Sequence, residues 1–363
     1  MSTFDDYFAA LAAADAAAAL DTLEQALARG ASRGDLVRDI VIPAQQRVGD
    51  LWFDGTWTVA DEHAATAISE QALARLSAAS ARDADTLRVV LACAEGEWHT
   101  LPARLARGLA EDTALEVIMV GGSVPADHLG RHLRVVAPAA LALSCTMPTN
   151  LIGAARSIDA AHAAGVPVIV GGWAWGGSQH RARRLGADMW LADATRLTEA
   201  VRSVAGMPVT AGAHPVPAEA LLLDAVPTEL IERALARQSA RDAWLSSMTS
   251  VQRDRTFEDF GWLARHAAAA VACDDPTIVR DVLSWLLGLL TPRGVPAEAI
   301  IDSCDYLAGA VTDDAPRAAG ILRDEASRAR AARIGETSAG HGAEPSGEPG
   351  DRGDRRDPMG ERP

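Results

Sequence analysis

The stretch LRVVLACAEGEWHTL, residues 87–101, decides the fold of this chain. It opens with a short, almost continuously apolar run and then passes through a polar loop into a segment with helical spacing. A continuous apolar run, in contrast to an alternating one, favours a strand that is covered on both faces of its sheet. Four similar runs follow, at residues 115–121, 140–145, 166–172 and 188–193.

Stretches with helical spacing separate these runs, at residues 101–111, 148–164 and 195–204. Alternating strands and helices are typical of parallel βαβ units, in which helices cover both faces of the sheet. Residues 86–206 are therefore predicted to form a flavodoxin-like α/β domain with a doubly wound parallel sheet of five strands.

Helical patterns flank this domain on both sides. Residues 1–82 have alanine and leucine at helical spacing, which predicts a bundle of about four helices. Residues 206–218 are rich in proline and glycine, as is typical of a linker, and residues 219–335 again have helical spacing. Residues 336–363 hold almost no apolar side chains, so we expect them to be disordered. The predicted fold class is thus multidomain: a helical bundle, an α/β sheet domain and a C-terminal all-α domain.

Charge and composition exclude some classes of function. The 363 residues carry a formal net charge of −15, which repels the phosphates of nucleic acids. The densest basic stretch, Arg181, Arg183 and Arg184, is interpreted as the solvated face of a helix. The four cysteines are scattered without metal-ligand spacing, and no segment has the pattern of a signal peptide or a membrane span. We expect a soluble, cytoplasmic protein that binds neither nucleic acid nor membrane.

Polar residues and glycines follow the predicted strands, at the sheet edge where open parallel sheets bind ligands. His99, after the first strand, can give a lone pair to a metal ion while Glu97 binds the other ring nitrogen. After the third and fourth strands come Ser144, Thr146, Gly171, Gly172 and Trp173. Glycines let a flat group approach the backbone closely. Taken singly, a loop histidine or a Gly-Gly pair is more often an ordinary loop or turn residue.

Together, these residues resemble the cobalamin-binding domain of methionine synthase and the corrinoid proteins, whose motif is Asp/Glu-x-His-x-x-Gly. This chain has Glu97-x-His99-x-x-Pro102, and Ser144-Cys145-Thr146 where that family has Ser-x-Leu. The resemblance implies that His99 is the lower axial ligand of cobalt. It also implies that Ser144, Thr146 and the Gly171-Gly172 pair line the slot for the displaced dimethylbenzimidazole tail.

A second pattern lies in the N-terminal region. Trp52 is followed after nine residues by Glu62 and His63, and this spacing resembles the cap of the CarH-type adenosylcobalamin photoreceptors. The resemblance implies that the three side chains contact the upper adenosyl ligand. The alternative for Trp52 and Trp57 is core packing of a small bundle. Phe53 stands where those repressors carry a second cobalt-binding histidine, and no DNA-binding helix-turn-helix precedes the cap.

The C-terminal region admits two interpretations. Its aromatic residues can form an ordinary helical core with a dimerisation face. They can also form a chromophore pocket, because the order of the three domains resembles that of the photocobilins, which bind biliverdin beside cobalamin. Under the second interpretation the candidate bilin-binding residues are Arg253, Arg255, Trp262 and His266.

The sequence therefore predicts a light sensor, and not an enzyme, that binds adenosylcobalamin and, in the second interpretation, biliverdin. Light would change its conformation or its assembly as a homo-oligomer, expected to be a dimer, and thereby signal to a downstream protein partner. Two alternatives stay open. One is a corrinoid carrier of a methyltransferase system, and the other is a cobalamin sensor without photochemistry.

Overall fold

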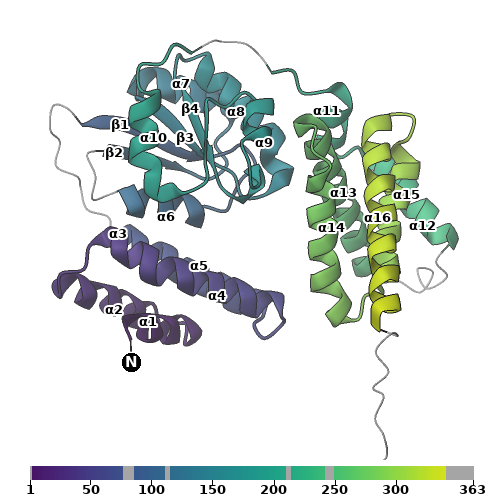
Figure 1. The fold of residues 1–363 in the computed structure, drawn as a ribbon, viewed down its shortest axis with the longest axis horizontal. Coiled ribbons are helices and arrows are strands. Elements are labelled where there is room, and N and C mark those ends of the chain that lie inside the picture. Colours follow the sequence, from purple (N-terminus) through teal and green to yellow (C-terminus); the bar gives the residue numbers. More distant parts are fainter. Residues whose placement is uncertain (1, 77–85, 111–114, 210–213, 242–248, 341–363) are drawn as a thin grey trace, which may run out of the picture.

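The computed structural model describes residues 2–76, 86–110, 115–209, 214–241 and 249–340, and it divides the chain into three parts (Figure 1). The first part, hereafter the cap, is helical. It comprises α1 (Thr3–Ala12), α2 (Ala16–Ala28), α3 (Arg33–Leu36), the π-helical turn η1 (Val37–Val41), α4 (Ile42–Phe53) and α5 (Val59–Leu76). The side chain of Ser2 caps α1. Pro43 directly follows the π-helical turn η1 within one continuous helical run, and its missing N–H leaves a gap in the helical hydrogen bonds at that turn. The predicted helical bundle is confirmed.

The second part is the predicted parallel sheet. Its strands are β1 (Leu87–Cys93), β2 (Leu115–Gly121), β3 (Ala140–Ser144), β4 (Val168–Gly171) and β5 (Met189–Leu191). They lie in the order β2-β1-β3-β4-β5 and every neighbouring pair is parallel, which confirms the flavodoxin-like topology. The order reverses between β1 and β3, so the loops that follow these two strands border the crevice in which such sheets bind ligands.

Helices cover both faces of the sheet, as the continuous apolar strands predict (Figure 1). α6 (Leu101–Ala110) and α10 (Leu197–Val204) share a buried cluster on one face. α7 (Ala126–Val136), α8 (Leu151–His162) and α9 (His180–Arg184) pack on the other. Short 3-10 turns η2 (Pro148–Asn150), η3 (Trp173–Trp175) and η4 (Ala194–Arg196) complete the connections.

The third part is the predicted all-α domain. It consists of α11 (Ala218–Asp224), α12 (Thr228–Arg241), α13 (Ser250–Cys273), α14 (Thr277–Leu290), η6 (Thr291–Arg293), α15 (Ala297–Val311) and α16 (Pro316–Gly340). Helix α16 continues to Gly340, so it includes the first residues of the segment that is predicted to be disordered. An existing helix gains one backbone hydrogen bond for each residue it adds, so it can extend into polar sequence. Residues 341–363 lie outside the described residues.

The sheet domain and the C-terminal domain share one continuous buried core on the α8 side of the sheet. Arg181 fastens this contact, because its side chain donates to Asp275 at 2.7 Å, to the carbonyl of Ala174 at 2.9 Å and to Thr277 at 3.1 Å. Only 5% of Arg181 is exposed, so its interpretation as part of a solvated face is wrong. Charge patterning along the sequence reveals no tertiary partner, and here the partners come from a different domain.

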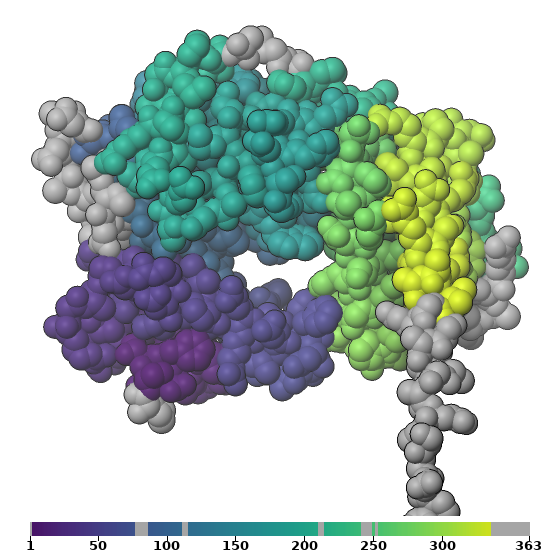
Figure 2. Space-filling model, viewed as in Figure 1, coloured from purple at the N-terminus to yellow at the C-terminus, as the bar shows by residue number. Residues whose placement is uncertain are grey.

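The cap, the sheet domain and the C-terminal helices surround an opening (Figure 2). Glu70 of α5 joins the cap to the sheet domain by accepting a hydrogen bond from Thr100 and by facing Arg104 at 3.7 Å. The four cysteines are buried and form no disulfide. Among the described helices, none combines the length and the apolar character that a bilayer crossing requires.

Candidate functional site

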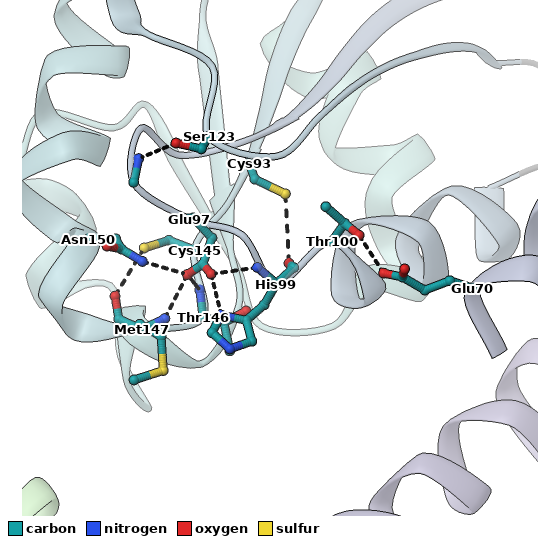
Figure 3. A network of polar contacts seen from close by, with 11 residues as sticks. Glu70, Cys93, Glu97, His99, Thr100, Ser123, Cys145, Thr146, Met147 and Asn150 are labelled. Carbon is teal, nitrogen blue, oxygen red and sulfur yellow. Dashed lines mark hydrogen bonds and ion pairs between the residues drawn. The ribbon is translucent and has the colours of Figure 1, made fainter. Parts of the chain in front are cut away.

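The site is built around the carboxylate of Glu97, in the loop after β1 (Figure 3). Glu97 is fully buried and accepts five hydrogen bonds. One oxygen accepts from the backbone N–H of His99 at 2.9 Å and from its ring Nδ1 at 2.5 Å. The other accepts from the N–H groups of Thr146 and Met147 at 2.8 and 2.9 Å and from the side chain of Asn150 at 3.1 Å. Glu97 thus joins the loops that follow β1 and β3.

These hydrogen bonds decide the charge of Glu97. Burial alone raises the pKa of its carboxyl, but the bonds from His99, Met147 and Thr146 outweigh burial and lower the pKa to about 2. Since the carboxylate is ionised, it orients the His99 ring with Nδ1 protonated, and its hydrogen bond raises the pKa of His99.

The opposite ring nitrogen of His99 is available for a ligand. The side chain is 57% exposed, and Nε2 has no hydrogen-bond partner within the part of the chain that the structure describes. The ring lies at the outer end of its loop, away from the buried strands (Figure 3). An imidazole held by a carboxylate at one nitrogen and open at the other is the arrangement found at histidine-ligated metals.

Ser144, Gly171 and Gly172 line a slot of about 220 Å³ between the sheet and helices α6 and α10. Most of its wall is apolar, from residues such as Leu91, Ala142 and Ile169, so the slot suits a flat heterocycle. Gly172 has a φ of +107°, and a Cβ there would lie 2.4 Å from the carbonyl oxygen of Cys145. Only glycine therefore fits this position.

Thr146 and Trp173 face a different space, hereafter the interdomain cavity, of about 380 Å³ between the sheet edge and helices α13 and α14. The hydroxyl oxygen of Thr146 is buried and has no partner among the described residues, so it is free to bind a ligand. Trp173 is 63% exposed. The structure therefore divides the predicted residues between two cavities on either side of the Glu97–His99 pair.

The predicted cap residues lie on two helices, Trp52 on α4 and Glu62 with His63 on α5. Glu62 accepts from Thr66 at 2.9 Å and pairs with His63 at 2.5 Å, and its charge contributes to the raised pKa of His99. Trp52 lies outside the buried core of the cap, and its ring lies 6.0 Å from that of Trp285 in α14. Trp57, by contrast, packs against the cap core. The core-packing interpretation therefore holds for Trp57 and not for Trp52.

Two of the four candidate bilin residues come together. Trp262 and His266 both line the interdomain cavity, with their rings 4.1 Å apart. Arg253 and Arg255 are exposed and line none of the cavities described here, so the structure does not place them with the other two. Sequence spacing could not reveal this, because one long helix, α13, carries all four residues past several different environments.

His266 is held in its neutral form. Burial lowers its pKa to about 4, while its Nδ1 donates to the carbonyl of Trp262 at 2.9 Å. Since a carbonyl can only accept, Nδ1 carries the proton and Nε2 is an acceptor.

The sequence interpretation missed three residues of this region. Asn150 binds Glu97, Arg181 lines the interdomain cavity, and Trp285 lines the same cavity and contacts Trp52. No spacing signal marks them, since each depends on a contact made across elements distant in sequence.

Comparison with protein families identifies both N-terminal parts. Residues 3–77 match the family model of a B12 binding domain, and residues 87–202 match that of another B12 binding domain. The chain carries two cobalamin-binding domains. The residues also fit the cofactor, because His99 has an available Nε2 for cobalt and the slot beside Ser144 and Gly171 suits the nucleotide tail. No curated protein matches the sequence.

Solved structures similar to this chain include three proteins that act on or bind corrinoids. The monomethylamine corrinoid protein of Methanosarcina barkeri is 17% identical, with a TM-score of 0.47, over 56% of this chain and 98% of that one. A cobalamin-binding protein of Desulfitobacterium hafniense DCB-2 is 22% identical, with a TM-score of 0.32, over 57% and 100%. The methanol:cobalamin methyltransferase complex of Methanosarcina barkeri is 19% identical, with a TM-score of 0.31, over 57% and 81%. Similarity at this level supports no conclusion about function.

Replacing His99 and its partner should separate ligation from orientation. We expect His99→Ala to lose the absorption spectrum of histidine-ligated cobalamin, because the benzimidazole of the cofactor or a water molecule would then occupy the position of the imidazole on cobalt. Glu97→Gln should weaken cobalamin binding by about 10- to 100-fold, since a misoriented ligand binds less well. Equilibrium dialysis and absorption spectra measure both effects. Unchanged spectra in His99→Ala would remove this residue from the site.

A larger side chain in the slot should prevent the nucleotide tail from binding without affecting the rest of the corrinoid. Gly171 lines the slot and tolerates a Cβ at 3.4 Å from its nearest neighbour, so Gly171→Leu should fold and occupy the space. We expect it to lower the affinity for cobalamin by at least about 100-fold, through lost burial and steric overlap. Binding of cobinamide, which lacks the tail, should stay unchanged. Gly177→Leu is the control, because its position is open. Equal losses for both corrinoids would contradict the slot assignment.

Proposed function

We propose that this protein is a light sensor that binds adenosylcobalamin between its cap and its sheet domain. The observation that carries the proposal is the pairing of Glu62 with His63 on α5 at 2.5 Å, together with the position of Trp52 outside the buried core of the cap. The Trp52 and His63 side chains of the same cap add an indole and an imidazole. A cap of this composition suits a nucleoside as the upper ligand, because an indole stacks on a base while carboxylate and imidazole bind ribose hydroxyls. Bound adenosylcobalamin supplies a cobalt–carbon bond that visible light cleaves.

The roles of the residues follow from their places. His99 would hold the cobalt, Glu97 orients His99, and Ser144 with Gly171 and Gly172 would hold the nucleotide tail. Trp52, Glu62 and His63 bind only the upper ligand, so the preferred position of the cap depends on the presence of that ligand. A ligand shifts such an equilibrium by its difference in affinity for the two positions. Light would therefore change the conformation of the cap.

CarH-type repressors carry a second cobalt-binding histidine at the position of Phe53. The phenyl ring of Phe53 has no lone pair with which to bind cobalt. His63 is the nearest cap alternative by sequence, and its side chain is 73% exposed. We propose that the output of the sensor is a change in its own dimer or in the binding of a partner protein, and that it acts in the cytoplasm without catalysing a reaction.

We further propose that the interdomain cavity binds a linear tetrapyrrole such as biliverdin. Nε2 of the neutral His266 can accept a hydrogen bond from a pyrrole N–H, and Thr146 brings a hydroxyl without a partner among the described residues. Trp173, Trp262 and Trp285 offer aromatic faces for the rings. A second cavity of about 290 Å³ inside the helical domain also includes Trp262 in its wall, which adds space for a long chromophore.

The light response can be tested on the wild-type protein and on the variant Trp52→Ala. We expect the purified wild-type holoprotein to lose its adenosylcobalamin absorption bands under green light and to change its hydrodynamic size. The variant should bind adenosylcobalamin about tenfold more weakly, and hydroxocobalamin equally well, because only the former has the adenosyl group to stack. Trp57→Phe, which keeps an aromatic ring in the cap core, is the control.

Two outcomes would favour the alternatives. Inertness to light together with transfer of the methyl group of methylcobalamin would identify a corrinoid carrier. Loss of the adenosylcobalamin absorption bands under light, without any change in assembly or partner binding, would indicate a cobalamin sensor whose output does not use light.

Bilin binding has its own test in His266→Leu. Biliverdin added to the wild-type protein should give a bound red-absorbing band, and the variant should bind it about tenfold more weakly, because it loses the acceptor for the pyrrole N–H. Arg253→Ala and Arg255→Ala are matched controls on the same helix, and we expect both to bind biliverdin normally. Absence of the red band in the wild type would end this part of the proposal.

A further inference from the structure

We propose that Arg293 of the C-terminal domain is a positioning residue for Trp52, and that Gly288 forms the notch that receives Phe53. This inference deepens the proposed function, on which it rests for the role of Trp52. The docking itself involves only contacts between the cap and the C-terminal domain, so it can be tested without cobalamin.

Arg293 reaches from η6 to the end of helix α4. Its guanidinium donates to the carbonyl of Trp52 at 2.9 Å and to that of Phe53 at 3.2 Å. The last carbonyls of a helix lack partners within the helix and form its negative end, so a cation is stabilising there. One of the same nitrogens also donates to the carbonyl of Leu289, which ties the guanidinium to the end of α14. Arg293 thus joins the ends of two helices from different domains.

The ring of Phe53 lies against α14 at Gly288, while 37% of the residue stays exposed. A Cβ added to Gly288 would lie 3.0 Å from the ring atom Cζ of Phe53, so the helix surface is open there only because residue 288 has no side chain. This contact gives Phe53 a physical role in place of the histidine found in CarH-type repressors. At this position the chain carries an apolar side chain that contacts the C-terminal domain.

The ring of Trp52 also contacts the C-terminal domain. This ring lies 6.0 Å from that of Trp285, which lies 5.9 Å from Trp262, and Trp262 contacts His266 at 4.1 Å. Trp285 also lines the interdomain cavity. Trp285 therefore both contacts Trp52 and lines the interdomain cavity. Occupation of that cavity should alter the position of Trp52, since a packed chain of rings transmits displacement.

The rest of the cap is held elsewhere. Glu70, near the other end of α5, binds Thr100 and faces Arg104 of the sheet domain. The Trp52 end of the cap is therefore positioned by the C-terminal domain, while the Glu70 end is positioned by the sheet domain. Without Arg293 and the notch, we expect the Trp52 end to move while the cap stays folded and attached.

Amide hydrogen exchange of the full-length protein, without added cobalamin, tests the docking. We expect Arg293→Ala to speed exchange at residues 53–57 by about tenfold, because two charge-assisted hydrogen bonds to the end of α4 are lost. Arg293→Lys should recover part of the protection, and exchange in α1 and α2 should stay unchanged. Arg233→Ala is the matched control, since Arg233 pairs with Asp314 inside the C-terminal domain at 2.5 Å. Equal exchange in Arg293→Ala and wild type would overturn the proposal.

Two further measurements separate positioning from general loss of structure. The near-ultraviolet circular dichroism of the Trp52–Trp285 pair should weaken in Arg293→Ala and in Gly288→Ala, whose new methyl group displaces Phe53. Both variants should lose about tenfold in affinity for adenosylcobalamin relative to hydroxocobalamin, as a misplaced indole would predict. If the exchange result holds but both corrinoids bind as in the wild type, Arg293 docks the cap without positioning Trp52 for the adenosyl group, and the positioning role is wrong.

Discussion

The buried carboxylate of Glu97 is the interaction on which the rest of the site depends. A charge without solvent is costly unless it is fully hydrogen-bonded, and Glu97 meets this condition with five donors from the loops after β1 and β3. The same bonds fix the crevice at the switch point of the sheet and the orientation of His99. One ionised group therefore holds the backbone of both loops and orients the ring of His99.

A second constraint comes from the way in which the cap is held. Its buried core also packs against Leu101, Leu105 and Leu109 of α6 in the sheet domain. Besides this packing, Glu70 binds the sheet domain, and Trp52 and Phe53 contact the C-terminal domain. The cap, the sheet domain and the C-terminal helices surround an opening (Figure 2). The position of the cap therefore depends on both of the domains that it contacts.

The C-terminal domain packs against the sheet domain through a shared buried core. Its core is continuous with the α8 side of the sheet, and Arg181 joins the two through Asp275 and Thr277. Because this contact is buried and ionic, the two domains should move as one body, in contrast to the cap. The interdomain cavity, bordered by Thr146 on one side and His266 on the other, exists only because of this arrangement.

The sequence by itself determined the three domains, the parallel sheet and the places of Glu97 and His99, because apolar periodicity and strand-end position are local properties of the chain. It did not determine which side chains share a cavity. Arg181 was misinterpreted as solvated, Arg253 and Arg255 were grouped with Trp262 and His266, and the contacts of Arg293 with Trp52 were invisible. Each of these depends on packing between segments far apart in sequence, which a charge pattern or a helical repeat does not encode.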